Sequence, residues 1–396
     1  MKIKRVLRGV KYVLLYPIYG LSCLIPKKEN VWIFGAWNGN AYADNTRYVY
    51  EYVSKNTNIK AYWVTKEPEI CRMLQTKGFR AYMYNSLKGV FVAMFASVAF
   101  ITQTHEDVNY FACGKIKAIN TWHGVMMKKI LFDTQNMYRS PDVSIRWSYK
   151  YFPFGNIVGR NDYVVATSEM YRPITRSAFN VPDDHIYING YPRNDLFHSN
   201  NPPELIRKLK ETGKKVIIYL PTHRNFGAKH ETNPMIDIDT IDEKLNAEGW
   251  VMLYKPHYHE MKNFSQKHNL KAIVSSSEYD FTHNINTYLP FCDLLITDYS
   301  GAYFDFLLTN KPVVFFDYDL EWYIKNNSGL YFDYDEIAKG PHCKTWDEVF
   351  SACKKILEYD SWYEDRIRLK EKVFKFDDSQ NAKRVYEYAC CLTKRG

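Results

Sequence analysis

Short runs of β-branched and aromatic residues alternate with helix-like stretches along most of the chain. The expected strands comprise residues 31–34, 61–65, 98–102, 118–121, 163–166 and 186–189 in the first half and 215–219, 251–254, 272–275, 294–297 and 313–316 in the second. This alternation is typical of an α/β fold. Residues 200–203, with the sequence Asn-Asn-Pro-Pro, interrupt it as a linker would. The pattern therefore predicts two α/β domains that meet near residues 190–205.

The N-terminal segment differs because its apolar and basic side chains both follow helical spacing. The apolar stripe consists of Ile3, Leu7, Val10 and Leu14, and the basic stripe of Lys4, Arg8 and Lys11. A helix of this kind lies at an anionic membrane surface, and Pro17 is expected to end or kink it. The apolar stretch 12–26 is shorter than the ~20 residues that a spanning helix needs. Three alternatives stay open: a cleaved signal peptide, a lipoprotein signal ending at Cys23, and a helix packed on the protein.

The composition of the chain favours some kinds of ligand and argues against others. The 53 basic and 44 acidic residues give a formal charge of +9, which favours anionic ligands such as phosphates or acidic lipid head groups. Basic residues beyond the first eleven are interspersed with acids, and no RNA-binding motif occurs, which argues against nucleic acid. The eight cysteines form no CxxC pair. The sequence thus indicates neither a zinc site nor a disulfide scaffold, and a reducing compartment fits best.

Four polar segments directly follow expected strands. They are residues 121–124 (Thr-Trp-His-Gly), 221–224 (Pro-Thr-His-Arg), 255–257 (Lys-Pro-His) and 298–301 (Asp-Tyr-Ser-Gly). In open α/β sheets, ligands bind beyond the carboxyl ends of the strands. These segments are therefore the candidates for chemistry.

The segment 297–301 is suited to phosphate. Thr297 or Asp298 can cap a helix, while Ser300 and the small Gly301 leave the N–H groups of its first turn open to a ligand. The alternative is a plain helix cap without a ligand.

His123 and His257 are the candidate proton acceptors, because the intrinsic pKa of imidazole suits general base catalysis. The alternative for each is a packed, hydrogen-bonded histidine. His257 and His259 are only two residues apart and no carboxylate pattern completes a site, so metal binding is not expected.

Several basic residues lie within or close to strand ends in the sequence. Arg193, Arg224, Lys128 and Lys129 are candidates for neutralising a diphosphate, although each is also compatible with a solvated surface position. The aromatic residues around 317–323 follow another expected strand. They fit stacking on a base or, equally, filling the core.

Together these motifs resemble the CDP-glycerol glycerophosphotransferases, which build teichoic acids and related polyol-phosphate capsules. The matching segments are 34–45, 120–124, 190–195, 220–224, 255–257, 295–300, 311–312, 318–321 and 331–334, within roughly residues 30–370. Two positions depart from the family pattern: Val125-Met126-Met127-Lys128 replaces a small residue followed by Pro-Leu-Lys, and Gly301 replaces a second serine.

The resemblance implies a GT-B fold, in which two Rossmann-like domains face a central cleft. The implied division is 1–28 (membrane-associating segment), 29–200 (acceptor-side domain), 201–370 (nucleotide-binding domain) and 371–396 (a helix returning to the first domain). A hydroxyl of a lipid-linked or polymeric acceptor would attack the phosphorus bearing glycerol in CDP-glycerol, or ribitol in CDP-ribitol, and release CMP. The protein would lie peripherally on the cytoplasmic face of the bacterial membrane. The alternative function is a GT-B glycosyltransferase that uses a nucleotide sugar.

The resemblance also implies the site residues. The catalytic residues would be His123 and His257; the substrate-binding residues Arg193, Asn194, Thr222, Arg224, Lys255, Thr297, Asp298, Ser300, Gly301 and Glu321; and the acceptor-side residues Gly124, Lys128, Asp44 and Asn45. No protein-bound metal is implied, and Mg²⁺ would enter only with the donor diphosphate.

Overall fold

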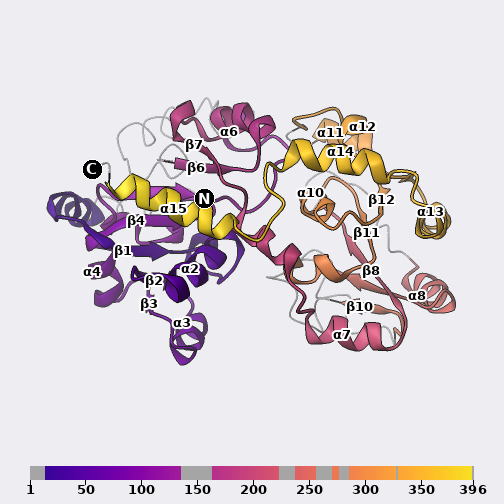
Figure 1. Cartoon of the computed structure of the whole chain (residues 1–396), viewed down its shortest axis with the longest axis horizontal. Coiled ribbons are helices and arrows are strands. Elements are labelled where there is room, and N and C mark those ends of the chain that lie inside the picture. The colour runs from indigo at the N-terminus through magenta and orange to yellow at the C-terminus, as the bar shows by residue number, and fades with distance from the viewer. Residues whose placement is uncertain are drawn as a thin grey trace. The chain divides into compact units, whose positions relative to one another are not determined.

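The computed structural model describes residues 14–134, 163–222, 237–255, 270–275, 285–326 and 329–394. The chain divides into two compact units (Figure 1). Unit 1 contains residues 1–123, 130–195 and 378–396, and unit 2 contains residues 124–129 and 196–377. Each unit is built on a parallel sheet, which confirms the predicted α/β class.

Unit 1 has a seven-stranded sheet in its described part, with the order β3-β2-β1-β4-β5-β6-β7. The strands are β1 (Lys28–Phe34), β2 (Lys60–Thr65), β3 (Ala81–Met83), β4 (Ala96–Ile101), β5 (Lys117–Asn120), β6 (Tyr163–Ala166) and β7 (Ile186–Ile188). Its helices include α2 (Asp44–Asn56), α3 (Pro68–Thr76), α4 (Leu87–Phe95), α6 (Arg172–Phe179) and α15 (Asn381–Lys394). The chain adds strands in one direction from β1 to β3 and in the other from β4 to β7, so the sheet switches direction between β1 and β4.

The core of unit 1 is built from strands that are buried on both faces, as parallel strands usually are. All six residues of β4 are buried, and Phe34 of β1 stacks on Phe100 of β4 with ring centroids 4.8 Å apart. Helix α15, drawn in yellow in Figure 1, covers this sheet. Its Tyr386 ring lies 5.7 Å from that of Trp32, and Asp195 accepts hydrogen bonds from the first backbone N–H groups of the helix. The last helix of the chain thus completes the first unit.

Residues 14–24 form a helix that packs on unit 1. Leu15, Ile18 and Tyr19 contact its core, and the Ser22 hydroxyl accepts a hydrogen bond from the Gly114 N–H at 2.8 Å. Pro17 lies inside this helix and does not end it; the other expectation, that it kinks the helix, stays a prediction. The preceding residues carry most of the basic and apolar stripes and lie outside the described part. Among the described residues, no helix is long and apolar enough to cross a membrane.

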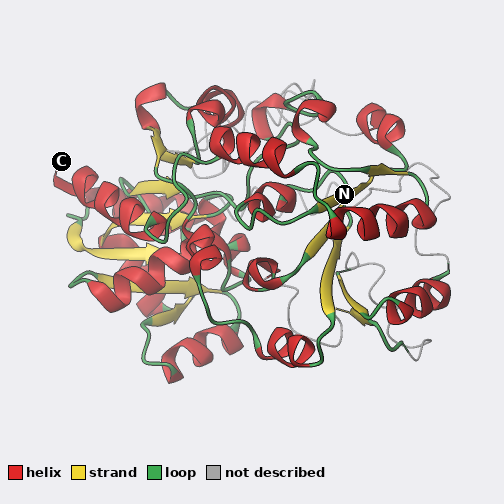
Figure 2. Cartoon of the chain, turned by 45° about the vertical axis from the view of Figure 1, so that its right-hand side comes forward, coloured by secondary structure: helices red, strands yellow, loops and turns green. Residues whose placement is uncertain are grey.

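Unit 2 has a six-stranded sheet in its described part, with the order β10-β9-β8-β11-β12-β13. The strands are β8 (Lys215–Leu220), β9 (Trp250–Tyr254), β10 (Ile273–Ser275), β11 (Leu294–Thr297), β12 (Val313–Phe316) and β13 (His342–Cys343). Its described α-helices are α7 (Glu204–Glu211), α8 (Ile238–Ala247), α10 (Ala302–Leu307), α11 (Leu320–Asn326), α12 (Tyr334–Ile337), α13 (Trp346–Glu358) and α14 (Tyr363–Val373). Figure 2 shows the helices of the chain in red and its strands in yellow. Here the sheet switches direction between β8 and β11.

A short segment far from unit 2 in sequence, residues 124–129, packs within that unit. The backbone N–H of Lys129 donates to the Gly329 carbonyl, and the N–H of Tyr331 donates to the Met127 carbonyl, both at 3.0 Å. Val125, Met126 and Met127 are buried. The apolar run that replaces the family's Pro-Leu pattern is therefore part of the packing of unit 2.

The contact between Gly190 and α15 gives a stability prediction. Gly190 has φ +74°, and a Cβ atom there would lie 2.0 Å from Asn381 Oδ1. Gly78, with φ +80° and no atom within 4 Å of the Cβ position, is the matched control in the same unit. We expect Gly78→Ala to lower the free energy of unfolding by about 1–2 kcal/mol from backbone strain, and Gly190→Ala by about 1–3 kcal/mol more from the clash. Denaturant titrations measure both, and equal losses would contradict the packing of α15.

Candidate active site

His123 lies at the carboxyl edge of the unit 1 sheet, just beyond β5. Its half-buried ring has the Trp122 ring 4.0 Å away and the Trp37 ring 5.2 Å away, centroid to centroid. Trp37 and Trp122 both have positive φ values, 51° and 52°. Non-glycine residues rarely adopt this conformation, and such residues cluster at functional sites.

The imidazole of His123 is oriented by a backbone carbonyl. His123 Nδ1 lies 3.2 Å from the oxygen of Thr102, the first residue after β4. A carbonyl only accepts, so Nδ1 carries the proton and Nε2 keeps its lone pair. Burial lowers the pKa of His123 below its ordinary value and Arg193 lowers it further, while Asp44 and the bond to Thr102 oppose the shift. The ring is therefore neutral near pH 7, with Nε2 ready to accept a proton.

The backbone around His123 is held by side chains from two other elements. The Asn45 amide, in the first turn of α2, donates to the carbonyls of Thr121 and Trp122, each at 2.9 Å, and its oxygen accepts from the Arg193 N–H at 3.1 Å. Arg193 Nη1 donates to the His123 carbonyl at 2.5 Å and pairs with Asp44 at 2.9 Å. Four predicted site residues thus meet in unit 1: Asp44, Asn45, His123 and Arg193.

This arrangement uses the guanidinium of Arg193 to fix the His123 backbone. Arg193 is only 5% exposed, and its carboxylate partner Asp44 shares the site. Removing either partner would leave a charge without its counterion in a buried place, which is costly. The predicted role of Arg193 in binding a diphosphate stays a prediction.

In unit 2, the ends of β8 and β11 are joined at the point where the sheet switches direction. The Thr222 N–H donates to the carboxylate of Asp298 at 2.9 Å, and the Thr297 hydroxyl donates to the Leu220 carbonyl at 2.8 Å. Thr297 and Asp298 are buried. Three predicted substrate-binding residues thus lie together at the expected ligand edge of the sheet.

The start of α10 differs from the expectation. The helix begins at Ala302 and its N-cap residue is Gly301, so the prediction that Thr297 or Asp298 caps it is wrong. The Ser300 hydroxyl accepts from the Ala302 N–H at 3.3 Å. A Cβ atom on Gly301 would lie 2.7 Å from the Val125 carbonyl oxygen. Glycine at this position allows the segment 124–129 to approach the helix start closely.

The tyrosines around this edge fill the core of unit 2. Tyr299 stacks on Tyr323 at 4.1 Å, and its hydroxyl donates to Asp319 at 3.1 Å. Tyr334 donates to the Asp298 carbonyl at 3.4 Å. All three rings are buried. Of the two interpretations given for the aromatic residues around 317–323, filling the core is therefore the one that fits Tyr323.

The other predicted residues are spread over both units. Asn194 is buried beside Arg193, Glu321 is exposed at the start of α11, and Lys255 follows β9. Gly124 and Lys128 belong to the segment that packs in unit 2, where the Lys128 ammonium lies 5.8 Å from the centre of the Tyr323 ring. Arg224 and His257 lie outside the described residues.

Most of the chain is similar to known proteins. The model of the CDP-glycerol:poly(glycerophosphate) glycerophosphotransferase family matches residues 18–390. The chain belongs to this family. It is 28% identical over 382 residues to a teichoic acid glycerol-phosphate transferase of Staphylococcus aureus, covering 94% of this chain and 95% of that protein. It is 27% identical over 364 residues to a teichoic acid poly(glycerol phosphate) polymerase of Bacillus spizizenii, covering 88% of each chain.

The fold of this glycerophosphotransferase is similar to a solved structure. The wall teichoic acid polymerase TagF superposes with a TM-score of 0.76 at 24% identity, over 99% of this chain and 98% of that one. A crystal of a substituted variant of the TagF polymerase was soaked with CDPG, and this chain superposes on that structure with a TM-score of 0.77 at 22% identity, with the same coverage. At these identities the likeness shows the fold alone.

Several residues near the sites were not predicted as site residues. In unit 1 these are Thr102 and Asp107, which lie outside the matching segments, and Trp37, which lies within the matching segment 34–45 but was given no role. In unit 2, the carboxylate of Asp317, just after β12, contacts His342 Nδ1 at 2.5 Å and Lys344 Nζ at 2.9 Å. Burial would raise the pKa of Asp317, but these two partners lower it overall. Sequence alone misses such residues because their partners lie on other strands.

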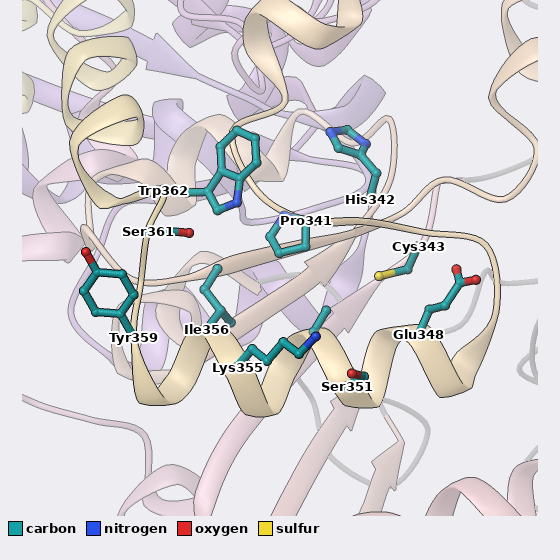
Figure 3. Close-up of a pocket in the computed structure, with 11 residues that line it drawn as sticks. Pro341, His342, Cys343, Glu348, Ser351, Lys355, Ile356, Tyr359, Ser361 and Trp362 are labelled. Atoms are coloured by element: carbon teal, nitrogen blue, oxygen red, sulfur yellow. The ribbon is translucent and has the colours of Figure 1, made fainter.

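A cavity of about 370 Å³ in unit 2 has no predicted site residue among the described residues that line it. Its walls are the strand β13, the helix α13 and the turn after it (Figure 3), with His342, Lys355 and Trp362 among the lining side chains. Within the described part of the chain, no cluster of three or more His, Cys, Asp or Glu residues is arranged to hold a metal ion.

The charges around His123 give a titration prediction. Asp44 raises the pKa of His123 and also pairs with Arg193, so Asp44→Asn removes a stabilising anion and leaves a cation uncompensated. Both effects disfavour the imidazolium. We expect the pKa of His123 to fall below its wild-type value in an NMR titration. Asp183→Asn, which changes an exposed partner of Arg172, is the control and should leave it unchanged. A rise in the pKa of His123 on Asp44→Asn would contradict this geometry.

Proposed function

We propose that this glycerophosphotransferase transfers glycerol phosphate from CDP-glycerol to a hydroxyl of a membrane-linked acceptor or a growing teichoic acid chain, releasing CMP. The observation that carries the proposal is the family match over residues 18–390. The neutral, oriented imidazole of His123 supports it, since an acceptor hydroxyl needs a base. The alternative function is a nucleotide-sugar glycosyltransferase, and an assay of CMP or UDP release from different donors would distinguish the two.

In the proposed reaction, His123 Nε2 takes the proton of the acceptor hydroxyl as the oxygen attacks the phosphorus that bears glycerol. The bond from this phosphorus to the bridging oxygen of the diphosphate breaks, and its electrons leave with CMP. The product is a phosphodiester, and the imidazolium returns its proton to solvent. Such transfer relies mainly on positioning and charge neutralisation, which we assign to Arg224, Lys255 and His257. Mg²⁺ bound to the diphosphate would also neutralise part of its negative charge.

We place the donor at the carboxyl edge of the unit 2 sheet, beside Thr222, Asp298 and Ser300. The switch in strand direction between β8 and β11 supports this, because such points are where open α/β sheets bind ligands. The CDPG soak of the TagF polymerase supports the class of donor. The GT-B arrangement and the choice between glycerol and ribitol stay predictions.

The base assignment is tested by substitution. His123→Gln keeps a polar side chain but removes the proton acceptor, so we expect kcat for CMP release from CDP-glycerol to fall by about 100 to 10,000-fold. His185→Gln, which alters a histidine stacked on Tyr163 in the same unit, should keep wild-type turnover. Comparable rates for His123→Gln and the wild type would remove His123 from the mechanism. CDP-ribitol and UDP-sugars, assayed in parallel, identify the donor.

We also propose that the protein lies on an anionic membrane surface, held by unit 1. Leu14, Leu21 and Leu24 on the helix 14–24 are 70%, 55% and 79% exposed, and Leu87 and Phe91 on α4 are 91% and 60% exposed. These five residues form what we term the apolar surface. Apolar side chains at this exposure on helices are typical of interfacial binding.

The two helices of the apolar surface are linked by a lysine. Lys27 Nζ donates to the Met94 carbonyl of α4 at 2.6 Å and to the Ser22 carbonyl at 3.2 Å. Three lysines beside these helices are exposed: Lys28 follows the helix 14–24, Lys88 lies on α4, and Lys115 follows Gly114, whose N–H donates to Ser22. Lys28 Nζ lies 4.8 Å from the centre of the Phe95 ring. Cations beside exposed apolar residues favour acidic head groups. The basic stripe before residue 14 would add to this attraction.

Vesicle binding tests the membrane proposal. Leu21→Glu with Leu24→Glu adds two negative charges and removes two apolar side chains, so affinity for phosphatidylglycerol vesicles should fall at least about 10-fold. Tyr359→Glu, at a 79% exposed aromatic residue of unit 2, is the matched control. Flotation of the double variant with vesicles at the wild-type level would show that attachment lies elsewhere.

A further inference from the structure

Asp107 is a buried carboxylate at the point where the unit 1 sheet switches direction. It is fully buried, at the end of a short 3-10 helix (His105–Asp107) that follows β4. The switch point lies between β1 and β4, so the loops after these two strands meet there. A Cβ atom on Gly35, directly after β1, would lie 2.0 Å from the Asp107 carbonyl oxygen. The two loops therefore pack backbone to backbone around Asp107.

The Asp107 carboxylate receives four hydrogen bonds from these loops. Oδ2 accepts from the Thr102 N–H at 2.7 Å, the Gln103 N–H at 2.9 Å and the Thr102 hydroxyl at 3.1 Å. Oδ1 accepts from the Asn38 N–H at 2.6 Å. All four partners donate, so both oxygens must accept, which suits the ionised form. Burial raises the pKa of Asp107, and these donated bonds oppose the shift.

Both loops that Asp107 joins contact the ring of His123. From the loop after β4, the Thr102 carbonyl accepts from His123 Nδ1. From the loop after β1, the Trp37 ring packs against the imidazole, and the Trp37 N–H donates to the Thr102 hydroxyl at 3.3 Å. Trp37 and Asn38 both have left-handed backbone conformations, with φ 51° and 55°. The bond from Asn38 to Asp107 is one of the contacts that hold this strained turn.

We infer that Asp107 is a positioning residue for His123: its carboxylate fixes the Thr102 carbonyl and the Trp37 turn, and thereby the Nδ1–H tautomer and the orientation of the ring. Only the expected effect of Asp107 on the rate of transfer rests on the proposed function. The tautomer itself is a property of the resting protein.

The test replaces Asp107 by Asn. The asparagine side chain has only one acceptor oxygen, and its NH₂ group takes the place of the other carboxylate oxygen. This NH₂ group would face N–H donors, so the two loops are expected to shift. In ¹⁵N NMR spectra, the His123 signals are assigned by their loss in His123→Gln. We expect the wild type to show the Nδ1–H pattern and Asp107→Asn to show a mixture with the Nε2–H pattern. We expect kcat to fall by about 10 to 100-fold, with KM for CDP-glycerol unchanged.

Two further variants keep the test decisive. Asp242→Asn is the matched control: this buried carboxylate also accepts from successive backbone N–H groups, those of Lys271, Ala272 and Ile273, but in unit 2. It should leave the His123 signals unchanged. If Asp107→Asn does not fold, Thr102→Val removes one donor to Asp107 and the acceptor of the Trp37 N–H, and should shift the tautomer in the same direction.

The possible outcomes separate the two proposals. An unchanged Nδ1–H pattern in Asp107→Asn, or in Thr102→Val where that variant replaces it, would overturn the positioning role. A tautomer that responds equally to Asp242→Asn would also overturn it. Full activity of His123→Gln would instead remove the proposed base while leaving the NMR result to decide the role of Asp107.

Discussion

The hydrogen bond between His123 Nδ1 and the Thr102 carbonyl determines which nitrogen of the ring can accept a proton. It links the ends of β5 and β4, neighbours in the unit 1 sheet. The strands alone bring the two residues near each other, because the carboxyl ends of parallel strands lie at one edge. The direction of the ring depends further on Trp37, Trp122 and the Thr102 backbone. The chemistry thus depends on loops that the sheet brings together.

These loops contain buried charges and residues in left-handed backbone conformations. Both raise the free energy of the folded state unless hydrogen bonds and ion pairs offset the cost. Asp107 receives four donors, and Arg193 pairs with Asp44 while donating to the His123 carbonyl. An uncompensated charge in such a place costs several kcal/mol. Left-handed backbone at Trp37, Trp122 and Asp44 (φ 58°) costs about 1–3 kcal/mol per residue. The same polar contacts that satisfy the charges also hold this backbone, which favours one geometry around His123.

Hydrophobic pattern predicts the strands well, because buried parallel strands are continuous apolar runs. The strands β6, β11 and β12 have the predicted limits, and the short strands β3 and β13 were missed because two or three residues carry too little pattern. The position of His123 after β5 was also predictable. The roles of its partners Thr102, Asp107 and Trp37 were not predictable, because they arise from contacts between the ends of different strands. Trp37 lies in the matching segment 34–45, but the motif does not show that its ring packs against His123. Gly301 was expected to leave space for a ligand, but the Val125 carbonyl faces it.

The central claim is that neutral His123 accepts the proton of the attacking hydroxyl. The most direct measurement compares two pKa values in the wild-type protein: that of His123 from an NMR titration, and that of the acid limb of kcat/KM for transfer from CDP-glycerol, which reports the free enzyme. The account predicts that the two values coincide and lie below the ordinary 6.5 of histidine. An acid limb that is absent, or that differs clearly from the titration of His123, would contradict it.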